Sequence, residues 1–145
     1  MKDPNQEALR WFTQSEDDLE FVRWLSEEKK FLDKGCFVAQ QSAEKAMKAC
    51  LYAQGERIVI GHSLFDFCEK IKINVSEFSE ILNECRRLDR YYIPTRYPNG
   101  LPGGIPFQHF TEEDIRNALN DVEKVVNFCR KFLQKKGVFA YNEKL

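Results

Sequence analysis

Arginines and tyrosines gather in one stretch of this sequence, and their chemistry suits phosphate binding. Arg86 and Arg90 lie about one helical turn apart, and Arg96 and Tyr97 follow soon after. Guanidinium groups bind phosphate through paired hydrogen bonds, and aromatic rings can stack on a base or on arginine. The same spacing is also typical of cations that stabilise a helix C-terminus and pair with acidic helix faces. Both interpretations stay open from these residues alone.

A second group of polar residues lies on one face of an expected helix. Gln41, Glu44, Lys45 and Lys48 follow the spacing i, i+3, i+4 and i+7. The simpler interpretation is a solvated face with a local Glu44–Lys48 ion pair. The alternative is a polar surface that faces a ligand or a second subunit.

His62 is one of two histidines, the other being His109. Arg57 precedes His62 by five positions, and a histidine with a nearby arginine is the minimum for metal-independent RNA cleavage. A histidine that starts a helix and bonds to the backbone is the simpler interpretation. No carboxylate pair, glycine-rich phosphate loop or Ser-His-Asp set accompanies it. We therefore assign no catalytic residue and keep His62 as a candidate.

The cysteines do not have the spacing of a metal site or a disulfide framework. There is no Cys-x-x-Cys pair, and the number of cysteines is odd. Each lies in an apolar or helical context, which predicts reduced, buried core residues and a cytosolic setting. The five positions are Cys36, Cys50, Cys68, Cys85 and Cys129.

Length and charge limit the functions that the chain can have. The 145 residues carry a formal net charge of −1, so no basic field favours broad nucleic-acid or membrane binding. We expect neither DNA nor a membrane as a partner, and RNA is disfavoured. With 43% hydrophobic and 31% charged residues, the composition predicts a soluble, cytoplasmic protein. The length predicts one domain over residues 1–145, with its core at about 5–136 and a tail at 137–145.

Hydrophobic periodicity predicts an all-α fold. Three long helices are expected over 4–28, 36–54 and 111–136, with a charged break over 29–34 that ends near Gly35. A stripe of small residues predicts that the second helix is central, and Thr111 with Asp114 predicts a capping pair. Two shorter helices follow Ser63 and Asn74. The proline- and glycine-rich stretch 92–110 is expected to be a long loop.

Several motifs together resemble the HEPN domain family. They are the run Gln40–Ala49, the triplet Arg96-Tyr97-Pro98, the stretch Trp11–Leu19, the triplet His62-Ser63-Leu64 and the pair Phe110-Thr111. Their order and spacing match the family over about residues 7–133. The cysteines and phenylalanines are most similar to the sacsin-type eukaryotic branch, which implies a chaperone-associated setting.

The resemblance implies an up-and-down four-helix bundle with an additional short helix and a long loop before the last helix. It also implies a homodimer that binds a nucleotide, with ATP and GTP as the candidates. Lys45, Lys48, His62 and Arg96 match the family motifs and become expected walls of a polar cavity between subunits. Arg86, Arg90 and Tyr97 are added to the site because of their spacing and chemistry.

One departure from the family bears on catalysis. Ribonuclease-type members resemble one another in an Arg followed a few residues later by a His, near the last helix. Here Arg96 is followed by His109 only after thirteen positions. We therefore expect a binding module rather than an enzyme. The alternatives are a metal-independent HEPN ribonuclease and a purely structural dimerisation module.

Overall fold

The computed structural model describes residues 3–139, and these fold into a bundle of helices. The elements are α1 (Pro4–Glu28), α2 (Leu32–Ala53), α3 (Leu64–Lys72), the 3₁₀ helix η1 (Ser76–Ile81), α4 (Leu82–Asp89), the 3₁₀ helix η2 (Pro98–Gly100), α5 (Pro106–His109) and α6 (Glu112–Lys135). No strand occurs among these residues. The predicted all-α bundle is confirmed.

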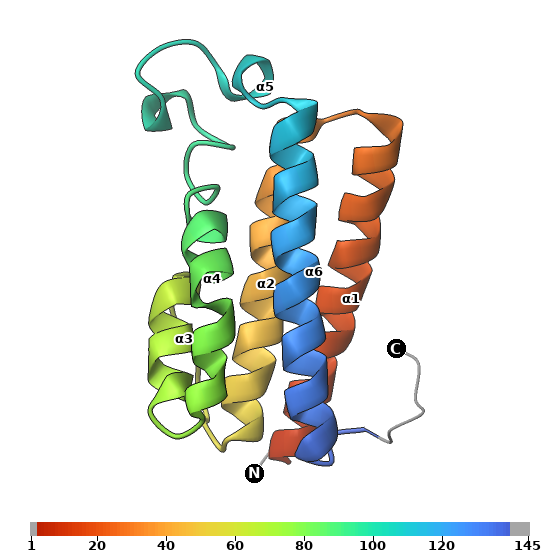
Figure 1. Cartoon of the computed structure of the whole chain (residues 1–145), viewed down its shortest axis with the longest axis vertical. Helices are drawn as coiled ribbons and strands as arrows, with labels where there is room; N and C mark the ends of the chain where they lie inside the picture. The colour runs from red at the N-terminus through yellow and green to blue at the C-terminus, as the bar shows by residue number, and fades with distance from the viewer. Residues whose placement is uncertain (1–2, 140–145) are drawn as a thin grey trace.

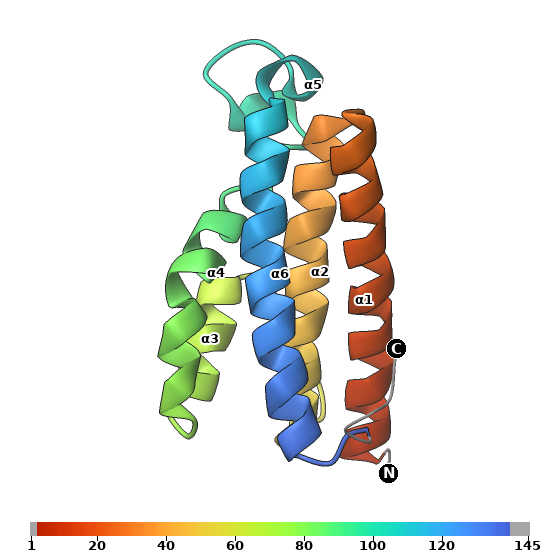
Figure 2. The same ribbon diagram turned by 45° about the vertical axis from the view of Figure 1, so that its right-hand side comes forward.

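The arrangement is that of an up-and-down bundle with one extra helix. Helices α1, α2, α4 and α6 alternate in direction, and α3 packs beside α4 as the additional short helix (Figures 1 and 2). Helix α2 contacts α1, α6, α3 and α4, so it is central, as the stripe of small residues predicts. The stripe itself is fully buried: Cys36, Ala39, Ala43, Ala46 and Cys50.

Local hydrogen bonds explain where several helices begin. Asp3 is the N-cap of α1, and its carboxylate accepts a hydrogen bond from the Asn5 amide at 2.9 Å. Pro4 follows it in the first turn, where a proline is tolerated. The Ser63 hydroxyl caps α3 by accepting a hydrogen bond from the Asp66 amide. At the start of α6, Thr111 and Asp114 bond to each other's backbone amides, which confirms the predicted capping box.

The start of the second helix was predicted wrongly. Helix α2 begins at Leu32 rather than Cys36, so Gly35 lies inside the helix instead of ending the break before it. A Cβ atom on Gly35 would lie 2.3 Å from Cδ1 of Ile115 in α6. This glycine therefore lets the Ile115 side chain of α6 lie directly against the backbone of α2. The turn before α2 instead uses Lys29 and Phe31, with φ angles of 57° and 50°.

Three further segments differ in detail from the prediction. The helix expected after Asn74 is divided into η1 and α4, and the loop over 92–110 contains η2 and α5. The expected tail contains buried residues, because Val138 and Phe139 pack on the core and the Phe139 ring stacks on Phe12 with centroids 5.9 Å apart. The rest of that tail, 140–145, lies outside the described residues.

The cysteines are in the state that their sequence context predicts. All five cysteines are buried free thiols. Burial raises the pKa of Cys36 to about 12, since the thiolate would lose its hydration. Over residues 3–139, no helix combines the length and the apolar character needed to cross a membrane.

Candidate functional site

Arg96 lies in a cluster of aromatic rings that joins the end of α4 to the side of α2. Its guanidinium carbon is 4.5 Å from the ring centroids of Phe37 and Tyr92 and 5.0 Å from that of Tyr97. Its Nε donates a hydrogen bond to the carbonyl oxygen of Tyr92 at 2.8 Å. No carboxylate pairs with Arg96 within residues 3–139. The stacked guanidinium is thus held in place while its terminal nitrogens keep their donor capacity.

His62 belongs to the same cluster through Tyr92. The two rings stack with centroids 4.8 Å apart and an interplanar angle of 21°. The His62 Nδ1 lies 3.1 Å from Oε1 of Glu44, and the His62 side chain is 55% exposed. Its carbonyl oxygen accepts a hydrogen bond from Gln40 at 3.0 Å. The imidazole is therefore oriented by a carboxylate rather than by the backbone bond that the sequence suggested.

Glu44 is the buried centre of this polar group. Its carboxylate lies 3.2 Å from Lys48 Nζ and within 3.4 Å of the amide nitrogens of Gln40 and Gln41. The predicted Glu44–Lys48 ion pair is therefore present, but the predicted solvated face is wrong for these two residues, since both are buried. Burial of two opposite charges is tolerated here because they pair and the carboxylate accepts further hydrogen bonds.

The two predicted lysines of α2 are both engaged with other groups. Lys48 Nζ lies over the rings of Trp11 and Phe67, at 5.4 and 5.8 Å from their centroids. Lys45 forms an ion pair with Asp18 of α1. Both cations are thus neutralised by carboxylates, which reduces their capacity to hold a phosphate.

The arginines of α4 point to separate partners. Arg86 bonds to Asn83 at 3.0 Å and lies 5.0 Å from the centroid of Phe65. Arg87 forms two hydrogen bonds to Asp121, at 2.9 and 2.8 Å, and this bonding raises the pKa of Arg87. Arg90 lines a polar cavity between α4 and α6. Arg87 lines the same cavity, so these two arginines share a side of the helix end, whereas Arg86 lies apart from them.

The predicted site is therefore divided. The structure brings together Arg96, Tyr97 and His62, and it connects Lys48 to them through Glu44. It leaves Arg86 beside Phe65 of α3 and Arg90 at the cavity between α4 and α6. Arg57 is exposed, and no contact joins it to His62 within residues 3–139. Phe37, Tyr92 and Glu44 were not predicted as site residues. Tyr92 precedes Arg96 by four positions, which was the available signal for their contact.

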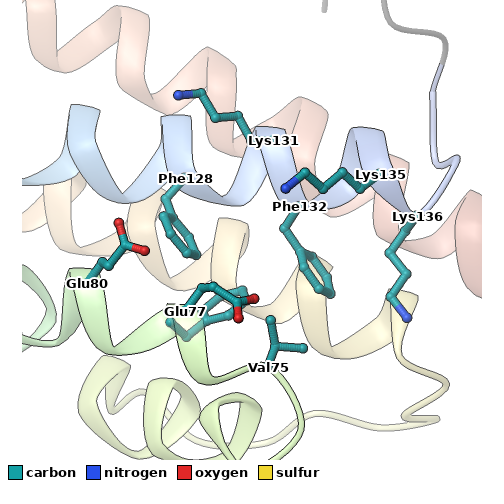
Figure 3. Close-up of a pocket in the computed structure, with 9 residues that line it drawn as sticks. Val75, Glu77, Glu80, Phe128, Lys131, Phe132, Lys135 and Lys136 are labelled. Carbon is teal, nitrogen blue, oxygen red and sulfur yellow. The ribbon is translucent and has the colours of Figure 1, made fainter.

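A further cavity, of about 460 Å³, lies between α6 and η1 and contains none of the predicted ligand-binding residues (Figure 3). Phenylalanines line it together with charged groups of both signs. Its lining residues are Val75, Glu77, Phe78, Glu80, Phe128, Lys131, Phe132, Lys135 and Lys136. Within residues 3–139, no group of three His, Cys, Asp or Glu side chains is placed to hold a metal ion.

Known proteins are similar to this chain in sequence and in fold. The protein named "Putative toxin MJ1304", of Methanocaldococcus jannaschii, is 29% identical over 137 residues, which cover 89% of this chain and 90% of that protein. The crystal structure of TT1696 from Thermus thermophilus has a TM-score of 0.80 at 30% identity, and the match covers 87% of this chain and 98% of that one.

Two other solved structures carry the family's name. ST0689, an archaeal HEPN homologue, matches with a TM-score of 0.68 at 30% identity over 92% of this chain and 99% of its own. A HEPN domain protein of Thermotoga maritima has a TM-score of 0.68 at 26% identity, over 87% and 98% of the two chains. The model of the HEPN domain matches residues 8–132. This chain belongs to the HEPN domain family.

Proposed function

We propose that this HEPN domain binds a nucleotide-like anionic ligand at the cluster of Arg96, Phe37, Tyr92, Tyr97 and His62, hereafter the Arg96 cluster. The observation that carries the proposal is the guanidinium of Arg96, which is oriented by three rings and one carbonyl oxygen but pairs with no carboxylate of residues 3–139. Such a group keeps donors for a phosphate and loses little freedom when it binds.

The surrounding residues supply complementary chemistry. The Tyr97 ring is 50% exposed, which leaves area for a base to stack on it. His62 and Arg96 both lie against the Tyr92 ring, and the exposed imidazole of His62 leaves its Nε2 for a polar contact with a ligand. A small ligand with phosphate at Arg96 and a base at Tyr97 uses each of these groups. Binding of one small anion is compatible with a net charge of −1 for the chain, because it needs one local cation and no positive charge over the whole surface.

Calorimetric titration with ATP and with GTP tests the proposal. We expect binding of at least one nucleotide. Affinity at the Arg96 cluster should fall at least tenfold with Arg96→Gln and by less with Tyr97→Ala. The matched control is Arg86→Gln, which removes an arginine that lies on Phe65 outside the cluster. Melting curves establish that each variant is folded. Absence of binding by the intact protein, or unchanged affinity in folded Arg96→Gln, would contradict the site.

Metal-independent RNA cleavage is the second candidate, and the His62–Glu44 contact favours it. With its Nδ1–H donated to Glu44, His62 has Nε2 available as a base. Nε2 would take the proton of a ribose 2′-hydroxyl while that oxygen attacks the adjacent phosphorus to form a 2′,3′-cyclic phosphate. The bond from phosphorus to the 5′-oxygen would break, and the proton held on Nε2 would pass to that oxygen, directly or through water. Arg96 would hold the phosphate. The relative named as a toxin is consistent with an activity of this kind.

Incubation with single-stranded RNA in EDTA separates this candidate from binding alone. Cleavage that is lost in His62→Ala and reduced in Glu44→Gln would support it. Equal cleavage by the intact protein and His62→Ala would show contamination and exclude His62 as the base. Nucleotide binding without any cleavage would leave the binding function as the remaining assignment.

Pairing of two chains also stays a prediction. The outer face of α1 carries Phe21 and Trp24, whose half-exposed rings stack at 6.5 Å, and Phe31 is exposed beyond them. Exposed apolar rings that lie together are typical of contact surfaces. Light scattering is expected to give twice the 17.1 kDa mass of the chain. Trp24→Glu is expected to shift that mass toward one chain. A single-chain mass for the intact protein would contradict pairing.

A further inference from the structure

The polar cavity that Arg90 lines lies between the end of α4 and α6. It has a volume of about 360 Å³ and is formed where α4 and the residues after it face α6. Its lining residues are Arg87, Arg90, Tyr91, Asn117, Asn120 and Asp121. Arg87 and Arg90 are one turn apart on the α4 side, and Asn117 and Asn120 are one turn apart on α6. The cavity shares no residue with the Arg96 cluster.

The acidic groups at this cavity already have cationic partners. Asp121 accepts two hydrogen bonds from Arg87, at 2.9 and 2.8 Å. Glu84 lies one turn before Arg87 on α4, and its carboxylate accepts a hydrogen bond from Lys124 at 2.8 Å. The Arg87–Asp121 pair therefore forms a wall of low net charge and fixes the spacing between the two helices.

The remaining side chains are available donors. Arg90, Asn117 and Asn120 are exposed, and their side chains make no hydrogen bond or ion pair with any other residue of 3–139. Among the charged lining residues, two arginines face one aspartate, so the cavity has an excess of positive charge. A guanidinium between two amide side chains suits an oxyanion that accepts several hydrogen bonds at once.

We propose that this cavity is a phosphate-binding subsite in which Arg90 carries the charge and Asn117 and Asn120 donate to the phosphate oxygens. The phosphate could come from a free nucleotide or from the backbone of an RNA strand, since both present the same oxygens. The proposal is independent of the Arg96 cluster and predicts two anion sites for each chain.

Calorimetric stoichiometry with GTP separates the two sites. The intact protein is expected to bind two GTP molecules per chain, Arg90→Gln one, Arg96→Gln one, and the double variant none. Asn120→Asp keeps the shape of the side chain and adds a negative charge, so we expect it to behave like Arg90→Gln. Arg86→Gln, an exposed arginine of the same helix outside the cavity, is the matched control. All substituted residues of the cavity are exposed, so melting curves are expected to coincide.

A ten-nucleotide single-stranded RNA is the second probe. A tenfold or greater loss of RNA affinity in Arg90→Gln would assign the phosphate to an RNA strand, whereas loss of GTP binding alone would assign it to a nucleotide. If Arg90→Gln and Asn120→Asp bind both probes as the intact protein does, the subsite is refuted. If binding is lost in Arg90→Gln but kept in Arg96→Gln, the subsite stands and the Arg96 site fails.

Discussion

Replacing Gly35 with alanine tests the close contact between α2 and α6 on which the bundle depends. The added Cβ atom would lie 2.3 Å from Cδ1 and 3.1 Å from Cγ1 of Ile115. Non-bonded carbons rest at about 3.5–4.0 Å, so the nearest atom overlaps by more than an ångström. Ile115 is 1% exposed, and a close-packed interior leaves it little space to move.

Two opposing effects set the size of the change. Overpacking of a buried site costs about 1–3 kcal/mol. Alanine is more favourable than glycine in a helix by about 1 kcal/mol. The balance predicts that Gly35→Ala lowers the free energy of unfolding by about 0–2 kcal/mol. The control is Gly103→Ala, since a Cβ atom at that position would have no neighbour within 4 Å and the effect should be small.

A double-mutant cycle with Ile115→Val isolates the overlap, because valine lacks the Cδ1 atom. Alone, Ile115→Val is expected to cost about 0.5–1.5 kcal/mol. When Gly35→Ala is already present, adding Ile115→Val should cost less free energy of unfolding than it does alone, or should even stabilise the protein. Urea unfolding followed by circular dichroism measures all four proteins. Two results would refute the close contact. One is that the two substitutions change the free energy of unfolding additively, and the other is that Gly35→Ala alone stabilises the protein by the full gain of about 1 kcal/mol expected from helix propensity.

Three other substitutions or treatments have expected outcomes. Burial alone raises the pKa of Glu84, but the hydrogen bond from Lys124 and nearby charges hold that pKa below its ordinary value. Ionised Glu84 therefore stabilises the fold at neutral pH, and this contribution is lost as pH falls through the lowered pKa. Glu84→Gln should cost about 1 kcal/mol at pH 7 and make the free energy of unfolding, measured with urea, depend less on pH in acid. Asp89 accepts hydrogen bonds from the backbone amides of Leu64 and Phe65 at 2.8 and 3.0 Å, and Asp89→Asn should cost about 1–3 kcal/mol in the same measurement. Because all five cysteines are buried, a thiol reagent at pH 8 should label none of them in the native protein and all of them in denaturant, as mass spectrometry would show.

The sequence predicted the elements that depend on local pattern. The small-residue stripe of α2 and the Thr111–Asp114 capping box are both found, since spacing along one helix determines which side chains share a face. The position of Gly35 was predicted wrongly because a tertiary contact, and not a helix end, requires a glycine there. The contact is with Ile115, which lies far along the chain.

The candidate site could be predicted only in part for the same reason. Arg86 and Arg90 have the spacing of neighbours, but their surroundings come from α3 and α6. Glu44 and Lys48 have the pattern of an exposed face, but Lys48 lies against the rings of Trp11 and Phe67, and Glu44 contacts His62 from the segment after α2. Spacing identifies residues that share a side of a helix, whereas burial and pairing depend on which other element packs there.

The most direct test of the Arg96 assignment is the NMR signal of its Nε–Hε group during a nucleotide titration. That group donates to the Tyr92 carbonyl oxygen at 2.8 Å, so it is ordered and should give a distinct resonance, assigned by its loss in Arg96→Lys. We expect the Arg96 signal to shift progressively and to saturate with ATP or GTP, while the Arg86 signal stays unchanged. An Arg96 signal that does not move while nucleotide binds elsewhere would contradict the account.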